Sequence, residues 1–268
     1  MTELAQVKSL EEHFTYTERL ARISFFYARK YLVKKAPGKS LGECIRDHTP
    51  LLYHSLFHYE AATKWSSEPC QRILARANEM ADLPPEEFEE RMWESIRDYS
   101  RQRAEENYPM AVGVTAPPSW HCGSLTYDPP QGQPDGWVVF HIANGVGPHS
   151  IFEDPEYLPC CFRLLMKETE VKYNSNTLTT STWLNDRPRW LALFPQEWHD
   201  NLSPKDPNAL PAWSVASWGQ IITSRGTVDP KREQAVRDTG ILKYATRKSH
   251  CSFENLRRRL DDYLREIR

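Results

Sequence analysis

The sequence predicts an α+β fold in which an N-terminal helical bundle packs on a small mixed β-sheet with flanking helices. The first observation is the distribution of turn-forming residues: of 20 Pro and 11 Gly, only 5 Pro and 2 Gly precede residue 109. A segment poor in Pro and Gly favours helices, and a segment rich in both favours strands and turns. The second observation is that strand-like and helix-like patterns alternate after residue 109. We therefore expect a helical portion, 1–108, and a portion rich in Trp, Pro and Gly, 109–268, which together form one compact unit.

The helical portion contains five segments that carry the signals of helix starts and ends. Pro37-Gly38 ends the first segment, and Thr49-Pro50 gives the third a capping hydroxyl and a first-turn proline. The last segment places apolar side chains at 88, 92, 96 and 99 on one helical stripe. In chain order, the expected helices cover residues 11–35, 40–46, 49–65, 68–80 and 85 onward.

The second portion alternates strands with helices. Residues 136–142 are β-branched and aromatic, which predicts a buried strand. Asp154-Pro155 and Ser252 provide helix-start signals. The expected strands cover residues 136–142, 177–184 and 217–224, and the expected helices cover 156–170, 187–194 and 252–267.

Charge and composition exclude several classes of partner. The formal net charge is −2, so there is no electrostatic reason to expect a nucleic-acid or membrane partner. No stretch approaches the roughly 18 apolar residues of a membrane helix, and residues 1–14 lack the apolar core of a secretory signal. The six cysteines show no framework spacing. We therefore expect a cytoplasmic protein with reduced thiols.

Several motifs of known chemistry are missing from the chain. It contains no G-x-G-x-x-G, no G-x-x-x-x-G-K-[ST], no G-x-S-x-G, no H-E-x-x-H and no C-x-x-C. The first two bind nucleotides and the others mark hydrolases or metal sites. We therefore expect no nucleotide cofactor and no resident metal.

The expected helix over 49–65 carries three candidate catalytic residues. His54 and His58 are four residues apart, so they share one face of the helix. Glu60 lies among aromatic residues, where burial would raise the pKa of its carboxyl toward that of a base working near neutral pH. Two alternatives stay open: all three side chains have structural partners, or the two histidines bind a metal with a third ligand.

Polar side chains also follow two expected strands. Ligands of α/β layers bind beyond the carboxyl ends of strands, where His141, Asn144, Asn185 and Asp186 fall. We name His141 as a candidate catalytic residue and the other three, together with Trp183, as candidate substrate-binding residues. In the alternative reading, Asn144 is a turn residue and Asn185 or Asp186 is a helix N-cap.

Two further groups complete the expected site. Trp183, Trp190 and Trp198 are candidates for an aromatic wall, with core packing as the alternative. Arg237 and Lys243 are candidates for binding a carboxylate, phosphate or sulfate, with a solvated basic surface as the alternative.

One stretch resembles a known family in the order of its elements and motifs. The order is a strand that ends in His141-Ile142, then a helix, then a strand that runs into Ser181-Thr182-Trp183-Leu184-Asn185-Asp186-Arg187-Pro188. This order is similar to the C-terminal part of proteins related to the GNAT acyltransferases, in which the two strands carry the motifs "HIP" and "SWLL". Ala143 replaces the proline, and the Q-x-x-G-x-G signature of that family is missing. The resemblance implies a GNAT-like sheet over residues 138–198 and an acyl-CoA donor.

These features lead to one functional hypothesis and two alternatives. We expect an enzyme of specialised metabolism that acts on a small polar metabolite by transfer to its amine, as an acyltransferase does. In the first alternative, the amine displaces an internal sulfate or phosphate without a cofactor, with an acid or histidine base and Arg237 and Lys243 as the anion site. In the second, the chain is a non-catalytic subunit that binds a protein partner in a biosynthetic complex. A protein partner or a homo-oligomer is compatible with each hypothesis.

Overall fold

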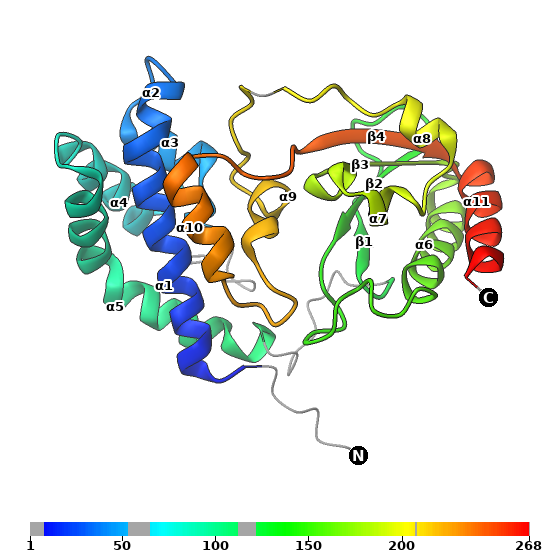
Figure 1. Cartoon of the computed structure of the whole chain (residues 1–268), viewed down its shortest axis with the longest axis horizontal. Helices are drawn as coiled ribbons and strands as arrows, with labels where there is room; N and C mark the ends of the chain where they lie inside the picture. Colours follow the sequence, from blue (N-terminus) through cyan, green and yellow to red (C-terminus); the bar gives the residue numbers. More distant parts are fainter. Residues whose placement is uncertain (1–7, 53–64, 112–121, 207, 268) are drawn as a thin grey trace. The chain divides into compact units, whose positions relative to one another are not determined.

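A computed structural model of the chain describes residues 8–52, 65–111, 122–206 and 208–267, and it confirms the α+β class (Figure 1). Its contacts divide the chain into two compact units. The helical unit comprises Met1–Thr115 and Asn208–Lys243, and the sheet unit comprises Ala116–Pro207 and Tyr244–Arg268. A division at residue 108 therefore misses the return of 208–243 to the helical unit.

The helical unit begins with a continuous helical run that the sequence predicts. Ser9 and Glu12 form a capping box, in which the Ser9 hydroxyl accepts from the Glu12 N–H and the Glu12 carboxylate accepts from the Ser9 N–H. A second capping box starts the next helix at Ser40. The elements are α1 (Leu10–Tyr27), the π-helix η1 (Ala28–Leu32), α2 (Val33–Lys35), α3 (Leu41–His48), α4 (Glu68–Glu79), α5 (Pro85–Ala111), α9 (Val215–Trp218), the 3-10 helix η4 (Gly219–Ile221) and α10 (Pro230–Thr239). Most of the helix expected over 49–65 falls outside the described residues.

The core of the helical unit lies between α1 and α5. The stripe expected on α5 is confirmed at Phe88, Met92 and Ile96, which are all buried. The rings of Phe25 in α1 and Phe88 in α5 form a T-shaped pair, with centroids 6.2 Å apart. Burial of these apolar side chains is the main source of stability for this unit.

The strand expected over 217–224 is wrong, because this segment forms α9 and η4. The Ser214 hydroxyl caps α9 by accepting from Ala216 N–H. The indole of Trp218 donates to His48 O (3.1 Å), and its ring packs edge-on against Tyr27 at 5.1 Å. Trp218 and Ile221 are both buried, and they are three residues apart in the sequence. This spacing is typical of a helix rather than of a strand.

The sheet unit is built on four strands in the order β1-β2-β3-β4. β1 pairs antiparallel with β2, β2 pairs parallel with β3, and β3 pairs antiparallel with β4. The expected strands 136–142 and 177–184 are confirmed, the second with two residues fewer. The sequence does not predict β1, which is only three residues long, or β4, which is mostly polar. The elements are β1 (Leu125–Tyr127), β2 (Trp137–Ile142), α6 (Tyr157–Tyr173), β3 (Thr177–Thr182), the 3-10 helix η3 (Trp183–Asp186), α7 (Pro188–Leu191), α8 (Gln196–Asp200), β4 (Arg247–Ser252) and α11 (Phe253–Glu266).

Helices α6 and α11 lie side by side over one face of this sheet (Figure 1). Val138 and Phe140 of β2 point to that face and are fully buried with Phe162 of α6. Because successive side chains of a strand alternate between faces, Val139 and His141 point to the other face. β2 therefore presents a core side and a side that carries His141.

Asn185 connects the sheet to the segment that follows it. Its amide nitrogen donates to Thr180 O (3.4 Å) and to Arg247 O (2.8 Å), which belong to adjacent strands. Its amide oxygen accepts from the indoles of Trp190 (2.9 Å) and Trp198 (3.3 Å). With 0% exposure, Asn185 fixes the end of β3 against the core.

We expect Asn185→Ala to lower the free energy of unfolding of the sheet unit by about 2–4 kcal/mol, since two indole donors lose a buried acceptor. Urea denaturation followed by tryptophan fluorescence measures this loss. Asn201→Ala is the control, because Asn201 makes a single long hydrogen bond to His250 O (3.3 Å). Equal losses in the two variants would contradict the role of Asn185.

Candidate functional site

The two parallel strands of the sheet separate toward their carboxyl ends. The ladder between β2 and β3 runs from Trp137↔Thr177 to Val139↔Thr179 and ends there. Beyond this ladder, the Thr180 hydroxyl donates to Phe140 O (2.7 Å). Ligands of α/β sheets bind beyond the carboxyl ends of their strands, so this opening is the candidate site.

The backbone of β2 presents a donor to this opening. Val139 O accepts from Asp128 N–H and Ala143 N–H donates to Ser124 O, so these groups face the β1 side. Backbone groups of a strand alternate between its two neighbours, and Phe140 O faces β3. The N–H of Ile142, two residues further on, therefore also faces β3, past the last rung of the ladder.

His141 forms a hydrogen-bonded pair with a carboxylate at the same edge. Its Nε2 lies 2.7 Å from Asp128 Oδ2, and the two side chains are 52% and 60% exposed. The hairpin fixes the pair, because Thr126 lies opposite His141 and Asp128 follows β1 directly. Among the described residues, Nδ1 of His141 has no partner. An imidazole oriented by a carboxylate and open at its other nitrogen has the geometry of a general base.

The Asn144 side chain forms hydrogen bonds within its own loop. Its amide nitrogen donates to His149 O (2.9 Å) and its amide oxygen accepts from Val146 N–H (3.2 Å). This is the turn role that the sequence offered as the alternative. The loop also holds a second exposed pair, His149 with Glu153 (3.1 Å).

The residues after β3 divide into structural residues and one surface residue. Asn185 is fully buried and all its groups are bonded, so its prediction as a substrate-binding residue is wrong. The Asp186 carboxylate accepts from Ala245 N–H (3.1 Å) and pairs with Lys205 (2.6 Å), so Asp186 also has a structural role. Trp183 is half-buried and remains at the carboxyl end of β3.

The expected aromatic wall is wrong for two of its three members. Trp190 and Trp198 are fully buried in the core of the sheet unit. The Trp198 ring stacks on Phe194 with centroids 4.1 Å apart. Because both indoles also donate to the same amide oxygen, they cannot reach a ligand.

The expected anion site is not available at Arg237. This side chain lies in the helical unit, where it pairs with Glu89 (2.7 Å) and with Glu233 (3.0 Å) over the ring of Phe26. Two carboxylates neutralise the guanidinium, which removes the support for Arg237 as the cation of a sulfate or phosphate displacement. Lys243 is exposed and belongs to the same unit.

The other three candidates, His54, His58 and Glu60, lie outside the described residues, and their roles stay predictions. In the part of the chain that the structure describes, no group of three or more His, Cys, Asp or Glu side chains is arranged to hold a metal ion.

The helical unit contains a buried pair of ionisable residues that the sequence reading missed. Lys8 is 4% exposed, donates to Gly226 O (2.9 Å), and lies 4.3 Å from the centre of the Tyr16 ring. His13 is 5% exposed, and neither ring nitrogen has a hydrogen-bond partner among the described residues. Burial lowers the pKa of Lys8 to about 8 and that of His13 to about 3. His13 lies on the apolar stripe of α1, three residues before Tyr16 and seven before Leu20, and this spacing is the signal that could have found it.

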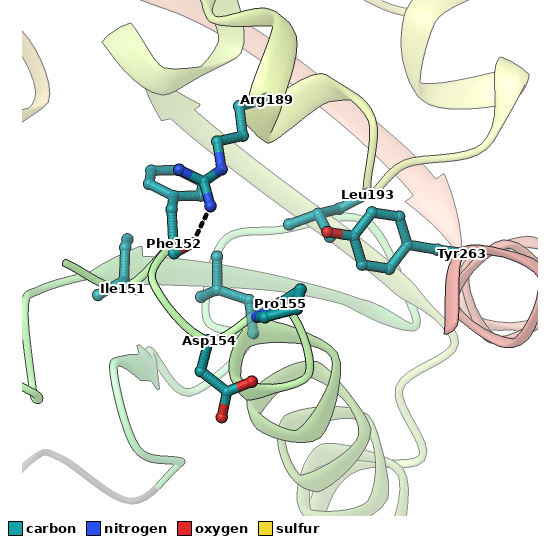
Figure 2. Close-up of a pocket in the computed structure, with 8 residues that line it drawn as sticks. Ile151, Phe152, Asp154, Pro155, Arg189, Leu193 and Tyr263 are labelled. Atoms are coloured by element: carbon teal, nitrogen blue, oxygen red, sulfur yellow. Dashed lines mark hydrogen bonds between the residues drawn. The ribbon is translucent and has the colours of Figure 1, made fainter. Parts of the chain in front are cut away.

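Figure 2 shows a shallow pocket in the sheet unit. It is lined by apolar side chains such as Ile151 and Leu193, and Arg189 donates across it to Phe152 O. Its volume is about 10 Å³, which leaves room for about one water molecule. The pocket is therefore too small for a metabolite.

Comparison with known protein families, curated proteins and solved structures gave no match. Within the described ranges, no helix has the length and hydropathy that crossing a bilayer requires.

We expect Arg237→Met to lower the free energy of unfolding of the helical unit by about 2–4 kcal/mol, because the buried Glu89 carboxylate would lose both of its close hydrogen bonds, whereas Glu233 would keep its pair with Arg19. Arg72→Met is the matched control, because its pair with Glu68 is exposed and contributes under about 1 kcal/mol. Thermal denaturation measures both. A gain of stability in sulfate that disappears in Arg237→Met would instead indicate an anion site.

We expect the stability of the helical unit to fall as the pH is lowered from about 6.5 toward 3. His13 titrates near 6.5 when unfolded and near 3 when folded, so the unfolded state binds the extra proton in this window. The loss of unfolding free energy approaches about 5 kcal/mol at the acid end of this window. Urea denaturation at pH 7, 5.5 and 4 measures the free energy of unfolding. Its pH dependence should be weaker in His13→Phe than in the wild type, and in His149→Phe it should equal that of the wild type. Parallel pH profiles for wild type and His13→Phe would contradict this assignment.

Proposed function

We propose that the sheet unit transfers an acyl group to the amine of a small polar metabolite at the carboxyl ends of β2 and β3. The observation that carries this proposal is the His141–Asp128 pair at 2.7 Å beside the separated strands. An amine is protonated near neutral pH and must lose a proton to react. A positioned imidazole supplies the base for that step.

The geometry supports a specific division of tasks. His141 Nδ1 takes the proton as the amine nitrogen attacks the carbonyl carbon, and Asp128 holds the ring and stabilises the imidazolium. The carbonyl oxygen gains negative charge, and the N–H of Ile142 is a donor that faces the opening. The C–N bond forms and the bond from the carbonyl carbon to the donor sulfur breaks. Conversion of an ammonium group to an amide releases two protons: the first passes through His141 to solvent before the attack, and the second passes through His141 to the departing thiolate, so that the donor leaves as a free thiol. The donor class, an acyl-CoA, follows from the resemblance of residues 138–198 to the GNAT-related proteins.

We expect wild-type protein incubated with acetyl-CoA and a panel of small diamines, amino alcohols and amino sugars to give an acetylated amine detectable by mass spectrometry. His141→Gln should lower kcat/KM by about 10²–10⁴-fold, and Asp128→Asn should cause a smaller loss in the same direction. Both side chains are exposed, so circular dichroism should show both variants folded.

His149→Gln is the matched control, because His149 is also exposed and also pairs with a carboxylate. It should keep the wild-type rate. Full activity of His141→Gln, or equal losses in the two histidine variants, would overturn the proposal. A folded wild-type protein that acetylates none of the amines would do the same.

A further inference from the structure

Arg187, directly after η3, packs over two stacked aromatic rings. The Trp183 and Tyr244 rings stack with centroids 5.7 Å apart and planes 28° apart. The Arg187 guanidinium carbon lies 5.7 Å from the first ring and 5.3 Å from the second. Stacking on aromatic faces holds the guanidinium through cation–π attraction.

This guanidinium lacks the acceptors that the other arginines of the sheet unit have. In the described part of that unit, every other arginine donates to a carboxylate or a backbone carbonyl, and Arg187 does neither. The arginines with such acceptors are Arg163, Arg189, Arg247, Arg257, Arg258, Arg259 and Arg265. The neighbouring Asp186 carboxylate does not compensate, because it is bonded to Lys205 and to Ala245 N–H.

Among the residues that the structure describes, none accepts a hydrogen bond from the edge of the Arg187 guanidinium. A guanidinium carries five N–H donors in its plane, and aromatic contacts cover its faces rather than its edge. A planar cation held in this way is preorganised for two parallel hydrogen bonds to an oxyanion. Its place is the end of β3, the strand that borders the candidate site.

We propose that Arg187, held by Trp183 and Tyr244, binds an oxyanion group of a substrate, either a phosphate or a carboxylate. The identity of that substrate as the acyl donor rests on the proposed function, since coenzyme A carries phosphates. The oxyanion site itself does not depend on acyl transfer.

The test measures binding of pyrophosphate, succinate and coenzyme A by titration calorimetry at low salt. At least one of the three should bind the wild type, and Arg187→Met should weaken that binding about tenfold or more. Arg189→Met is the control, because it removes the same charge two residues away from a side chain already bonded to Phe152 O. Trp183→Leu should weaken binding less than Arg187→Met, since it loosens the guanidinium without removing it.

Pyrophosphate binding identifies a phosphate site and succinate binding a carboxylate site. Binding that is unchanged in Arg187→Met, equally weakened in Arg189→Met, or absent for all three probes overturns the inference. Two results separate it from the proposed function. If the protein binds coenzyme A through Arg187 but transfers no acyl group, only the oxyanion site is supported. If the protein transfers acyl groups and Arg187→Met leaves the KM for acetyl-CoA unchanged, only the proposed function is supported.

Discussion

The sharing of β2 between two neighbours is the constraint on which the candidate site depends. Its first three residues pair with β3 and its last three pair with β1. Where a strand exchanges one partner for another, the backbone groups past the last rung of the first ladder need a side chain, a ligand or water as their partner. The same exchange places His141 opposite the hairpin strand, where Asp128 reaches it. The separation of the strands and the position of His141 therefore arise from one feature of the sheet.

The separated ends keep their positions through buried polar side chains. The Thr180 hydroxyl joins β3 to Phe140 O, and Asn185 joins β3 to β4 and to two indoles. Buried hydrogen bonds of this kind add specificity because each group left unpaired would carry a desolvation penalty. Trp190 and Trp198 therefore stabilise this region from the core of the sheet unit, whereas Trp183 is half-buried.

Sequence patterns predict the local features of this fold and miss the long-range ones. The helix that begins at Ser40 and the buried strand around Phe140 depend on nearby residues, so local patterns predict them. The strand expected over 217–224 fails because Trp218 packs on a distant helix. The anion site expected at Arg237 fails for the same reason, since Glu89, which accepts two of its hydrogen bonds, lies 148 residues away. His141 could be placed at a strand end, but its pairing with Asp128 depends on a hairpin register that no local pattern gives.

The central claim is that substrates bind at the carboxyl ends of β2 and β3, next to His141. The most direct measurement is an NMR spectrum of protein labelled with ¹⁵N at histidine, recorded with and without coenzyme A, with the His141 signals assigned through His141→Gln. We predict that the His141 ring signals shift on addition of coenzyme A and that those of His149 shift less. Saturating coenzyme A that leaves the His141 signals unchanged would contradict the account.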